Sequence, residues 1–329
     1  MDLNSDALSL GDRALHYGHG AFETIALLQG RPLFFEAHMA RLSWAIERLH
    51  LGGDPQRLIA QIRSACHAIT ETGLFKVIVT AGEGPRGYAS PSVSLAKPRL
   101  LTFWYPQPLN HALYRAPSAL YLCQTGLADQ PLLAGLKHLN RLEQVVATDE
   151  WQQVRERYPE HNIEGGLMAA CRCEADAQAR LIETTTANLF LIEFDGVTPL
   201  LITPSLLNAG VEGVVRRFVM EVAHGFGWRV EEAVVTLSRL SQANGCFITG
   251  TGVGIQRINA LYEEGVDASL QLIADWGTLW RASERSEPVV VPNLDYTELS
   301  QDDSASEAVV YQLWVALQHQ MRALDAVTL

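Results

Sequence analysis

Hydrophobic and polar positions follow two different periods in the N-terminal part of the chain. Strands are predicted from period-two and continuous apolar runs at residues 21–28, 31–35, 75–81 and 100–104. The first two would form a hairpin across Gln29 and Gly30. Residues 36–50 place their apolar side chains at helical spacing and predict an amphipathic helix. We therefore expect a small N-terminal α/β domain at residues 1–104.

Two prolines, Pro106 and Pro108, then interrupt the regular pattern. They predict a linker at residues 105–112, followed by a larger C-terminal domain at 113–329. That domain has predicted strands at 189–193, 199–202 and 246–249 and a predicted helix at 212–224. Two regions fit no such pattern, and we expect both to be additions to the compact core: residues 151–180, and the acidic, serine-rich residues 283–307, which predict a mobile loop.

Composition narrows the class of protein. With 329 residues and 48% hydrophobic content, the chain can bury one large core or two moderate ones. Its net charge of −12 with scattered basic residues argues against nucleic acid and anionic membranes as partners. It has no long apolar run and no signal-peptide pattern, so we expect a cytoplasmic protein with reduced cysteines. Cys171 and Cys173 lack a second pair, so no metal site is expected.

One lysine is the strongest candidate for chemistry. Lys137 follows Gly135 and precedes apolar residues at helical spacing, namely Leu139, Leu142, Val145 and Val146. The spacing predicts a helix, with the lysine at or just before its start. The electropositive helix end and the apolar neighbours would favour the neutral amine that Schiff-base chemistry requires. A solvated lysine with its stem over apolar neighbours is the other interpretation of this pattern.

Two glycine-containing segments could bind an anion. Residues 208–213 lead into the predicted helix at 212–224, whose first N–H groups would suit a phosphate. Gly250 and Thr251 end a predicted strand and could add further donors. Glu183 precedes another strand and could contact a protonated ring nitrogen. A plain glycine-rich helix entry and a surface carboxylate are the alternative interpretations of the first segment and of Glu183.

These segments together resemble the class IV aminotransferase family, the pyridoxal-phosphate enzymes of fold type IV. The matching motifs run in order from residue 11 to residue 257 and lie at 12–14, 17–24, 38–42, 137–144, 183–190 and 210–214. The resemblance implies a two-domain α+β fold like that of D-amino acid aminotransferase. It also implies a homodimer with pyridoxal 5′-phosphate as its cofactor.

The resemblance assigns roles to individual residues. Lys137 would hold the cofactor covalently, Glu183 would pair with the pyridine nitrogen, and Arg41 would bind the phosphate. Backbone groups would complete the phosphate cup, from Gly213, Val214, Val215, Gly250 and Thr251. Freed from the cofactor, Lys137 would also act as the base.

Residues 84–88 and 133–144 are similar to the lyase branch of the family, which forms 4-aminobenzoate and pyruvate in folate biosynthesis. For this substrate, Arg86 and Tyr88 would bind one carboxylate and Asn140 or Arg141 the other. Thr24 would assist protonation of the departing group. An aminotransferase acting on branched-chain or D-amino acids is the alternative, which the Gly250-Thr251 pair favours and Phe22 disfavours.

Overall fold

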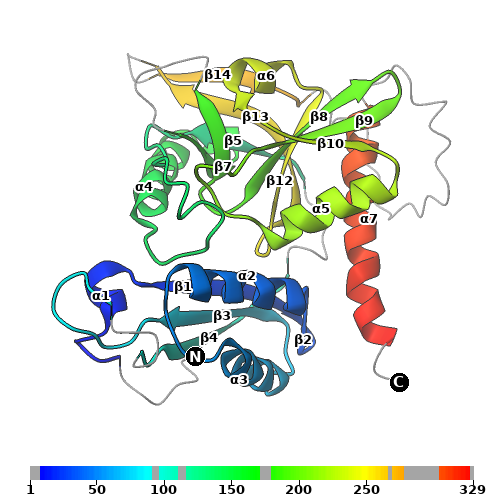
Figure 1. Cartoon of the computed structure of the whole chain (residues 1–329). Helices are drawn as coiled ribbons and strands as arrows, with labels where there is room; N and C mark the ends of the chain where they lie inside the picture. The colour runs from blue at the N-terminus through cyan, green and yellow to red at the C-terminus, as the bar shows by residue number, and fades with distance from the viewer. Residues whose placement is uncertain are drawn as a thin grey trace. The chain divides into compact units, whose positions relative to one another are not determined.

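The computed structural model describes residues 8–90, 96–109, 116–170, 179–265, 269–277 and 304–326 (Figure 1). The chain forms two compact units. The first contains residues 1–110, 135–142 and 320–329, and the second contains 111–134 and 143–319. The segment with Lys137 is thus grouped with the first unit, whereas the predicted division assigns it to the C-terminal domain. As a statement about folding domains, that division stays a prediction.

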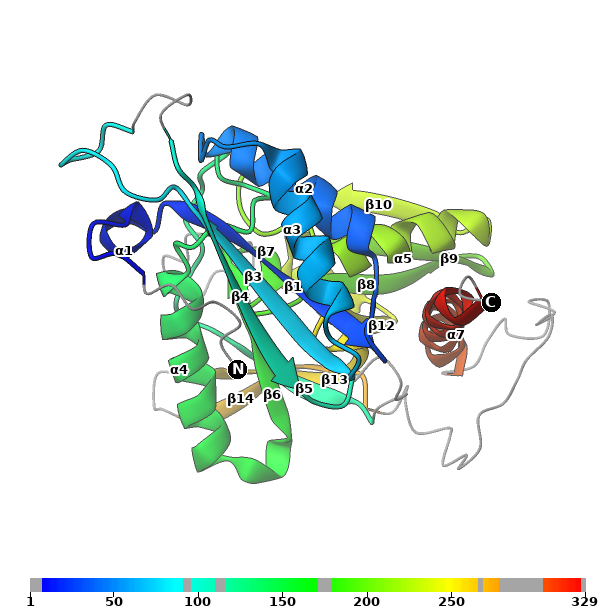
Figure 2. The ribbon, with the colours of Figure 1, turned by 90° about the horizontal axis from the view of Figure 1, so that it is seen from below.

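The first unit is built on a four-stranded antiparallel sheet in the order β2-β1-β3-β4. The strands are β1 (Gly20–Leu28), β2 (Arg31–Pro32), β3 (Gly73–Thr80) and β4 (Arg99–Pro106). The helices are α1 (Arg13–Tyr17), α2 (Phe35–Arg48) and α3 (Pro55–His67). In Figure 2, β1, β3 and β4 run side by side.

Burial alternates along the strands of this sheet, as expected when one face packs against helices. Glu23 and Ile25 of β1 are fully buried, while Phe22 before them and Thr24 between them are half-buried. The alternation continues in β3, where Val77 is fully buried and its neighbours are not. The buried face meets α2 through its apolar residues Met39, Leu42 and Ile46.

Local chemistry sets the helix starts. Asp12 and Asp54 cap α1 and α3 by accepting backbone N–H bonds, and Pro55 occupies the first position of α3. The strand predicted at 31–35 is shorter in the structure. It ends at Pro32, because Phe34 adopts a left-handed conformation with φ 53° and α2 begins at the next residue. The other strands and the helix predicted for this unit are confirmed within a few residues.

The second unit is built on a ten-stranded sheet with the path β10-β9-β8-β12-β13-β5-β6-β7-β11, to which β14 adds beside β13. Because β7 also pairs with β8, the sheet closes on itself. The strands are β5 (Ser118–Leu122), β6 (Ile163–Ala169), β7 (Arg180–Thr184), β8 (Asn188–Asp195), β9 (Thr198–Pro204), β10 (Arg229–Ala233), β11 (Val235–Thr236), β12 (Gly245–Gly250), β13 (Gly254–Glu264) and β14 (Leu270–Asp275).

Helices surround this sheet: α4 (Leu142–Arg157), the short η2 (Pro159–His161), α5 (Val214–Gly225), α6 (Leu237–Gln242) and α7 (Ser304–Ala326). Phe190 and Phe247 stack in its core with ring centroids 5.0 Å apart. A buried ion pair between Arg257 of β13 and Glu307 ties α7 to the sheet at 2.6 Å. The strands and helix predicted from residue 189 onwards are confirmed.

The expectation that residues 151–180 are an addition to the core is wrong. Residues 151–157 end α4, and β6 lies between β5 and β7 in the sheet, with Leu167, Met168 and Ala169 fully buried. Two glycines in β6 interrupt the run of apolar side chains, so the sequence gives only a weak indication of a strand there. The predicted loop at 283–307 lies mostly outside the described residues, but residues 304–307 begin α7.

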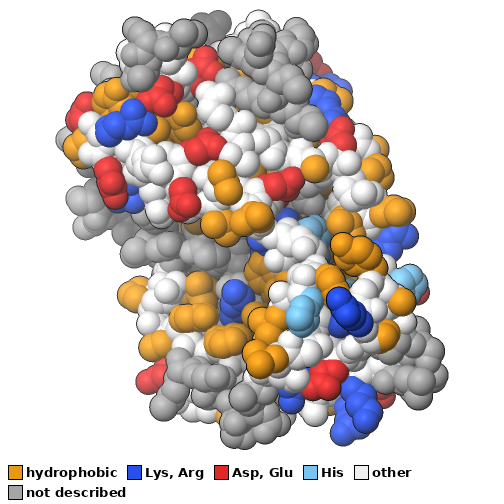
Figure 3. Space-filling model, turned by 90° about the vertical axis from the view of Figure 1, so that its left-hand side faces the viewer, with side chains coloured by type: hydrophobic (Ala, Val, Ile, Leu, Met, Phe, Trp, Pro, Cys, Tyr) orange, Lys and Arg blue, Asp and Glu red, His pale blue; other side chains and the backbone are white. Residues whose placement is uncertain are grey.

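Across the described parts of the chain, no helix is both long and apolar enough to cross a membrane. On the face drawn in Figure 3, basic and acidic side chains are interspersed with hydrophobic ones and form no continuous basic stripe.

Candidate functional site

Lys137 lies on a short extension of the first sheet. The Phe22 N–H donates to the carbonyl of Lys137 at 2.9 Å, and the Leu139 N–H donates to the carbonyl of Gly20 at 3.0 Å. His138 thereby faces Ala21 as an isolated antiparallel bridge. This pairing uses the first residues of β1. Their edge is available because β2 pairs with β1 only at Leu27 and Leu28.

The expectation of a helix start at Lys137 is therefore wrong. Helix α4 begins only at Leu142, and the backbone before it is engaged by β1, so the helix-dipole argument does not apply to this lysine. The predicted apolar face is also not the buried one. Leu142, Val145 and Val146 are 74%, 54% and 45% exposed.

Arg141 holds the same segment from its other side. Its Nε donates to the carbonyl of His138 at 3.0 Å and its Nη2 to the carbonyl of Leu136 at 2.6 Å. Together with the bond from Phe22, the carbonyls of three consecutive residues centred on Lys137 are fixed. Burial and the nearby Arg141 lower the pKa of His138 to about 4, so its ring is neutral near neutral pH.

Asn140 also contributes to holding this region. Its Nδ2 donates to the carbonyl of Gly18 at 3.3 Å, next to the end of α1. A Cβ on Gly18 would lie 2.3 Å from the Asn140 Oδ1, and its φ of 60° favours glycine as well. Asn140 and Arg141 are the alternatives predicted for the second substrate carboxylate. In this structure Asn140 contacts the backbone of Gly18, and Arg141 contacts the backbone on both sides of Lys137. Their substrate roles stay predictions.

The side chain of Lys137 lies over an aromatic ring. Its Nζ is 4.5 Å from the ring centroid of Phe22, within the range of a cation–π contact. Thr24 follows two residues later on β1 and therefore projects from the same face of the sheet as Phe22. Both residues are half-buried. This face thus carries the candidate base, an aromatic surface and a hydroxyl group.

The opposite face of β1 carries a buried charge cluster. Both Glu23 oxygens accept from Arg41, at 2.7 Å from Nε and 2.6 Å from Nη2, and the Nδ1 of His38 lies 2.8 Å from one of them. Burial alone would raise the pKa of Glu23, but the charge and hydrogen bonds of Arg41 and His38 outweigh it and lower the pKa to about 2. Burial lowers the pKa of His38, so His38 is neutral and donates its Nδ1 proton to Glu23.

Arg41 is thus held in one orientation by a bidentate carboxylate. Sequence analysis assigned no role to Glu23 and did not indicate that it contacts His38. Both stand inside the matching motifs, at 17–24 and 38–42, but their spacing along the chain does not show that they meet.

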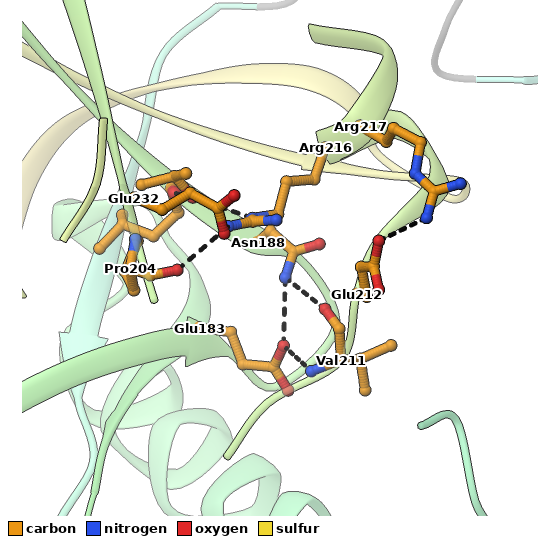
Figure 4. A network of polar contacts seen from close by, with 10 residues as sticks. Glu183, Asn188, Pro204, Val211, Glu212, Arg216, Arg217 and Glu232 are labelled. Carbon is orange, nitrogen blue, oxygen red and sulfur yellow. Dashed lines mark hydrogen bonds and ion pairs between the residues drawn. The ribbon is translucent and has the colours of Figure 1, made fainter. Parts of the chain in front are cut away.

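In the second unit, Glu183 is buried at the end of β7 (Figure 4). Its Oε2 accepts from the backbone N–H of Val211 at 2.8 Å and from Asn188 Nδ2 at 3.2 Å. The same Asn188 amide also donates to the carbonyl of Val211 at 2.8 Å. Glu183 is therefore no surface carboxylate, and Asn188, which sequence analysis assigned no role, orients it.

The start of α5 lies beside this group. Gly213 is the N-cap of the helix and makes no side-chain capping bond, so the first-turn N–H groups of Val214 and Val215 can serve a ligand. A Cβ on Gly213 would lie 1.9 Å from the Oδ1 of Asn188, so only glycine fits unless Asn188 moves.

Arg216 anchors α5 to the sheet. Its buried guanidinium donates to Thr203 Oγ1, to the carbonyl of Pro204 and to Glu232, the last at 2.7 Å (Figure 4). Gly250 and Thr251 join the same region, because Thr249 pairs with Asn188 across β12 and β8. The second unit therefore gathers a buried carboxylate, a helix N-terminus and a glycine turn.

Arg13 anchors the glycine loop at residues 82–89. It is buried, and its guanidinium donates to the carbonyls of Gly87, Tyr88 and Ala89 at 3.0–3.1 Å. The ring of Tyr88 also meets that of Tyr17, with centroids 5.5 Å apart. Arg86 is exposed on this loop. Arg13 therefore holds the predicted substrate loop at its C-terminal end, residues 87–89. The sequence pattern did not indicate this contact.

Comparisons with known proteins agree with this fold. The model of the family "Amino-transferase class IV" matches residues 20–162 and 169–261. The chain therefore belongs to the class IV aminotransferase family.

Two lyases are similar to this chain over most of its length. The aminodeoxychorismate lyase of Vibrio harveyi is 31% identical over 252 residues, which cover 77% of this chain and 86% of that protein. The crystal structure of 4-amino-4-deoxychorismate lyase from Pseudomonas aeruginosa is 36% identical, with a TM-score of 0.68 over 79% of this chain and 91% of that one. A mitochondrial branched-chain-amino-acid aminotransferase of Arabidopsis thaliana is 28% identical over 88 residues, or 27% of this chain and 22% of that protein.

Proposed function

We propose that this protein is a pyridoxal-phosphate-dependent lyase that converts 4-amino-4-deoxychorismate to 4-aminobenzoate and pyruvate. The observation that carries the proposal is the combination of 31–36% identity and coverage of most of the chain. The lyase relatives match 77–79% of the chain, and that span includes both the Lys137 segment and the Glu183 region. The reaction is a step of folate biosynthesis.

The residues present fit the cofactor. Lys137 offers a primary amine, the buried Glu183 offers a carboxylate for the ring nitrogen, and the uncapped start of α5 offers N–H groups for the phosphate. The close approach of Asn188 to Gly213 leaves a cradle that a side chain would fill. When bound, pyridoxal phosphate withdraws electrons from the carbon that bears the substrate nitrogen.

Gly250 and Thr251 would complete the phosphate cup, and Arg41 would add a cation whose orientation Glu23 fixes.

In the proposed reaction, the Lys137 amine removes the proton from the ring carbon that bears the amino group. The carbon–oxygen bond to the enolpyruvyl group breaks, the ring becomes aromatic, and the enolpyruvate gains a proton to become pyruvate. Thr24 lies on the same face of β1 and is our candidate for assisting that protonation. Aromatisation supplies much of the driving force, so the protein must mainly position the substrate. Arg86 and Tyr88 would bind one of its carboxylates.

We also propose that the enzyme is a cytoplasmic homodimer. Support for the dimer comes from α4, where Leu142, Val145 and Val146 present an exposed apolar strip at positions i, i+3 and i+4. A second copy of the chain would bury this strip. Analytical ultracentrifugation tests the assembly: Val145→Glu should shift the protein toward monomer, while a purely monomeric wild type would overturn the dimer.

An aminotransferase for branched-chain amino acids is the second candidate, because several such enzymes match this chain over about a quarter of its length. Both candidates use Lys137, and they differ in the fate of the cofactor. Amino acids would convert it to the pyridoxamine form only in an aminotransferase.

The test combines cofactor attachment with product formation. Protein incubated with pyridoxal phosphate is reduced with borohydride, and peptide mass spectrometry locates the label; we expect it on Lys137 and not on Lys97. The wild type is then given 4-amino-4-deoxychorismate, and pyruvate and 4-aminobenzoate are measured. We expect equal amounts of both products, and none from Lys137→Ala. A labelled protein that forms neither product would overturn the lyase, and conversion to the pyridoxamine form would favour the aminotransferase.

A further inference from the structure

The chain uses lysine very sparingly. Only three of its 25 basic residues are lysines, namely Lys76, Lys97 and Lys137. Two of the three meet at one aromatic ring. The Nζ of Lys76 lies 5.1 Å from the ring centroid of Phe22, and that of Lys137 lies 4.5 Å from the same centroid. The two amines therefore lie at most 9.6 Å apart, the sum of these distances.

The strand register explains this meeting. Lys76 of β3 pairs directly with Thr24 of β1, so both side chains project from the sheet face that carries Phe22. Lys76 is half-buried there, and no acidic side chain among the described residues forms an ion pair with it. The nearby Glu23 lies on the opposite face and is bound by Arg41.

A half-buried ammonium group beside a second amine favours an anion as its partner. Charges at such short range are only partly screened at physiological salt, so an anionic group bound beside Phe22 would be attracted by the Lys76 ammonium group. The proposed substrate has groups that suit this pair of lysines. Its six-membered ring carries the reacting amine at one end and a carboxylate at the opposite end.

We propose that Lys76 binds the ring carboxylate of the substrate, with Phe22 supplying apolar surface for the ring between Lys76 and Lys137. This inference rests on the proposed function and assigns the two substrate carboxylates to different cations. Lys76 takes the carboxylate on the ring, and Arg86 of the glycine loop takes the one on the enolpyruvyl group. A branched aliphatic side chain in the same place would leave the Lys76 charge without a partner, so Lys76 also favours the lyase over the aminotransferase.

The test compares Lys76→Met with Lys97→Met, which removes the same charge from an exposed position. Pyruvate release is measured against substrate concentration. Because a hydrogen bond to a charged group is worth about 1.5–3 kcal/mol, we expect Lys76→Met to raise KM by about tenfold or more, with a smaller effect on kcat. Lys97→Met should match the wild type, and Lys76→Arg should restore part of the loss.

Product binding supplies a readout that does not depend on turnover. The wild type should bind 4-aminobenzoate more tightly than aniline, which lacks the carboxylate, and Lys76→Met should lose most of this preference. Lys76→Gln gives a second variant if Met disturbs folding. A wild type that forms no 4-aminobenzoate would remove the proposed function itself. An active wild type with an unchanged KM and an unchanged ligand preference in both Lys76 variants would overturn the role of Lys76 alone.

Discussion

Replacing Glu23 by glutamine should destabilise the protein far more than replacing a surface carboxylate. Glu23 is fully buried and ionised between Arg41 and His38. Its pKa falls from 4.5 to about 2 on folding. A shift of that size corresponds to about 3 kcal/mol of stability at neutral pH. Removing one partner of a buried ion pair costs about 3–5 kcal/mol in other proteins, which agrees.

The matched control is Glu36→Gln. Glu36 lies on α2 and pairs with Arg63 at 2.9 Å, but their side chains are 77% and 45% exposed. Such a surface pair contributes about 1 kcal/mol or less. Urea unfolding followed by tryptophan fluorescence measures both variants, since Trp104 is buried in the same sheet. A loss for Glu23→Gln no greater than that for Glu36→Gln would refute the reasoning.

Acidification provides a second test of the same cluster. Because folding lowers the pKa of Glu23, its contribution is present above pH 4.5 and is lost as the pH falls toward about 2. His38 also has a lowered pKa, so its contribution is present above pH 6.5 and declines below it. The wild type should lose stability in both ranges. Glu23→Gln should keep only the decline below pH 6.5, because burial is the main cause of the His38 shift.

Two substitutions test the remaining parts of the site. Gly213→Ala should weaken pyridoxal-phosphate binding about tenfold or more in a titration, because its Cβ displaces Asn188. Gly225→Ala, at the open end of the same helix, should not. Arg141→Met should lower kcat more than it raises KM, because it frees the backbone beside Lys137, the proposed base. The control Arg155→Met, at an exposed position of α4, should leave both constants unchanged. If Arg141→Met changed KM alone, the result would instead support direct substrate binding by Arg141.

Local pattern predicted most of the first unit. The period-two run that became β1 and the helical spacing that became α2 are properties of neighbouring residues, so they can be read without the fold. The apolar pattern predicted the wrong secondary structure where a segment pairs with residues distant in the sequence. Residues 137–139 pair with β1 although the apolar spacing after Lys137 is helical, because the start of β1 offers an edge with unpaired backbone groups.

The candidate site shows the same division. Sequence motifs supplied the chemical groups of Lys137, Arg41 and Glu183, and they also supplied the glycine before α5. They did not reveal that Glu23 neutralises Arg41 or that Asn188 orients Glu183. The first contact joins β1 to α2, whose residues lie too far apart for a short sequence window. The second joins neighbouring strands, β7 and β8, but it depends on how the turn between them folds, which the apolar pattern does not show.

By itself, the sequence determined the elements with strong period, the family and the kinds of reactive side chain. Only the tertiary structure decided which of these side chains share a surface. The pairing of β1 with β3 brings Lys76 beside Thr24 and Phe22, and the edge pairing of β1 brings Lys137 to the same ring. Strand register fixes such contacts because a shift of one residue would turn each side chain to the other face of the sheet.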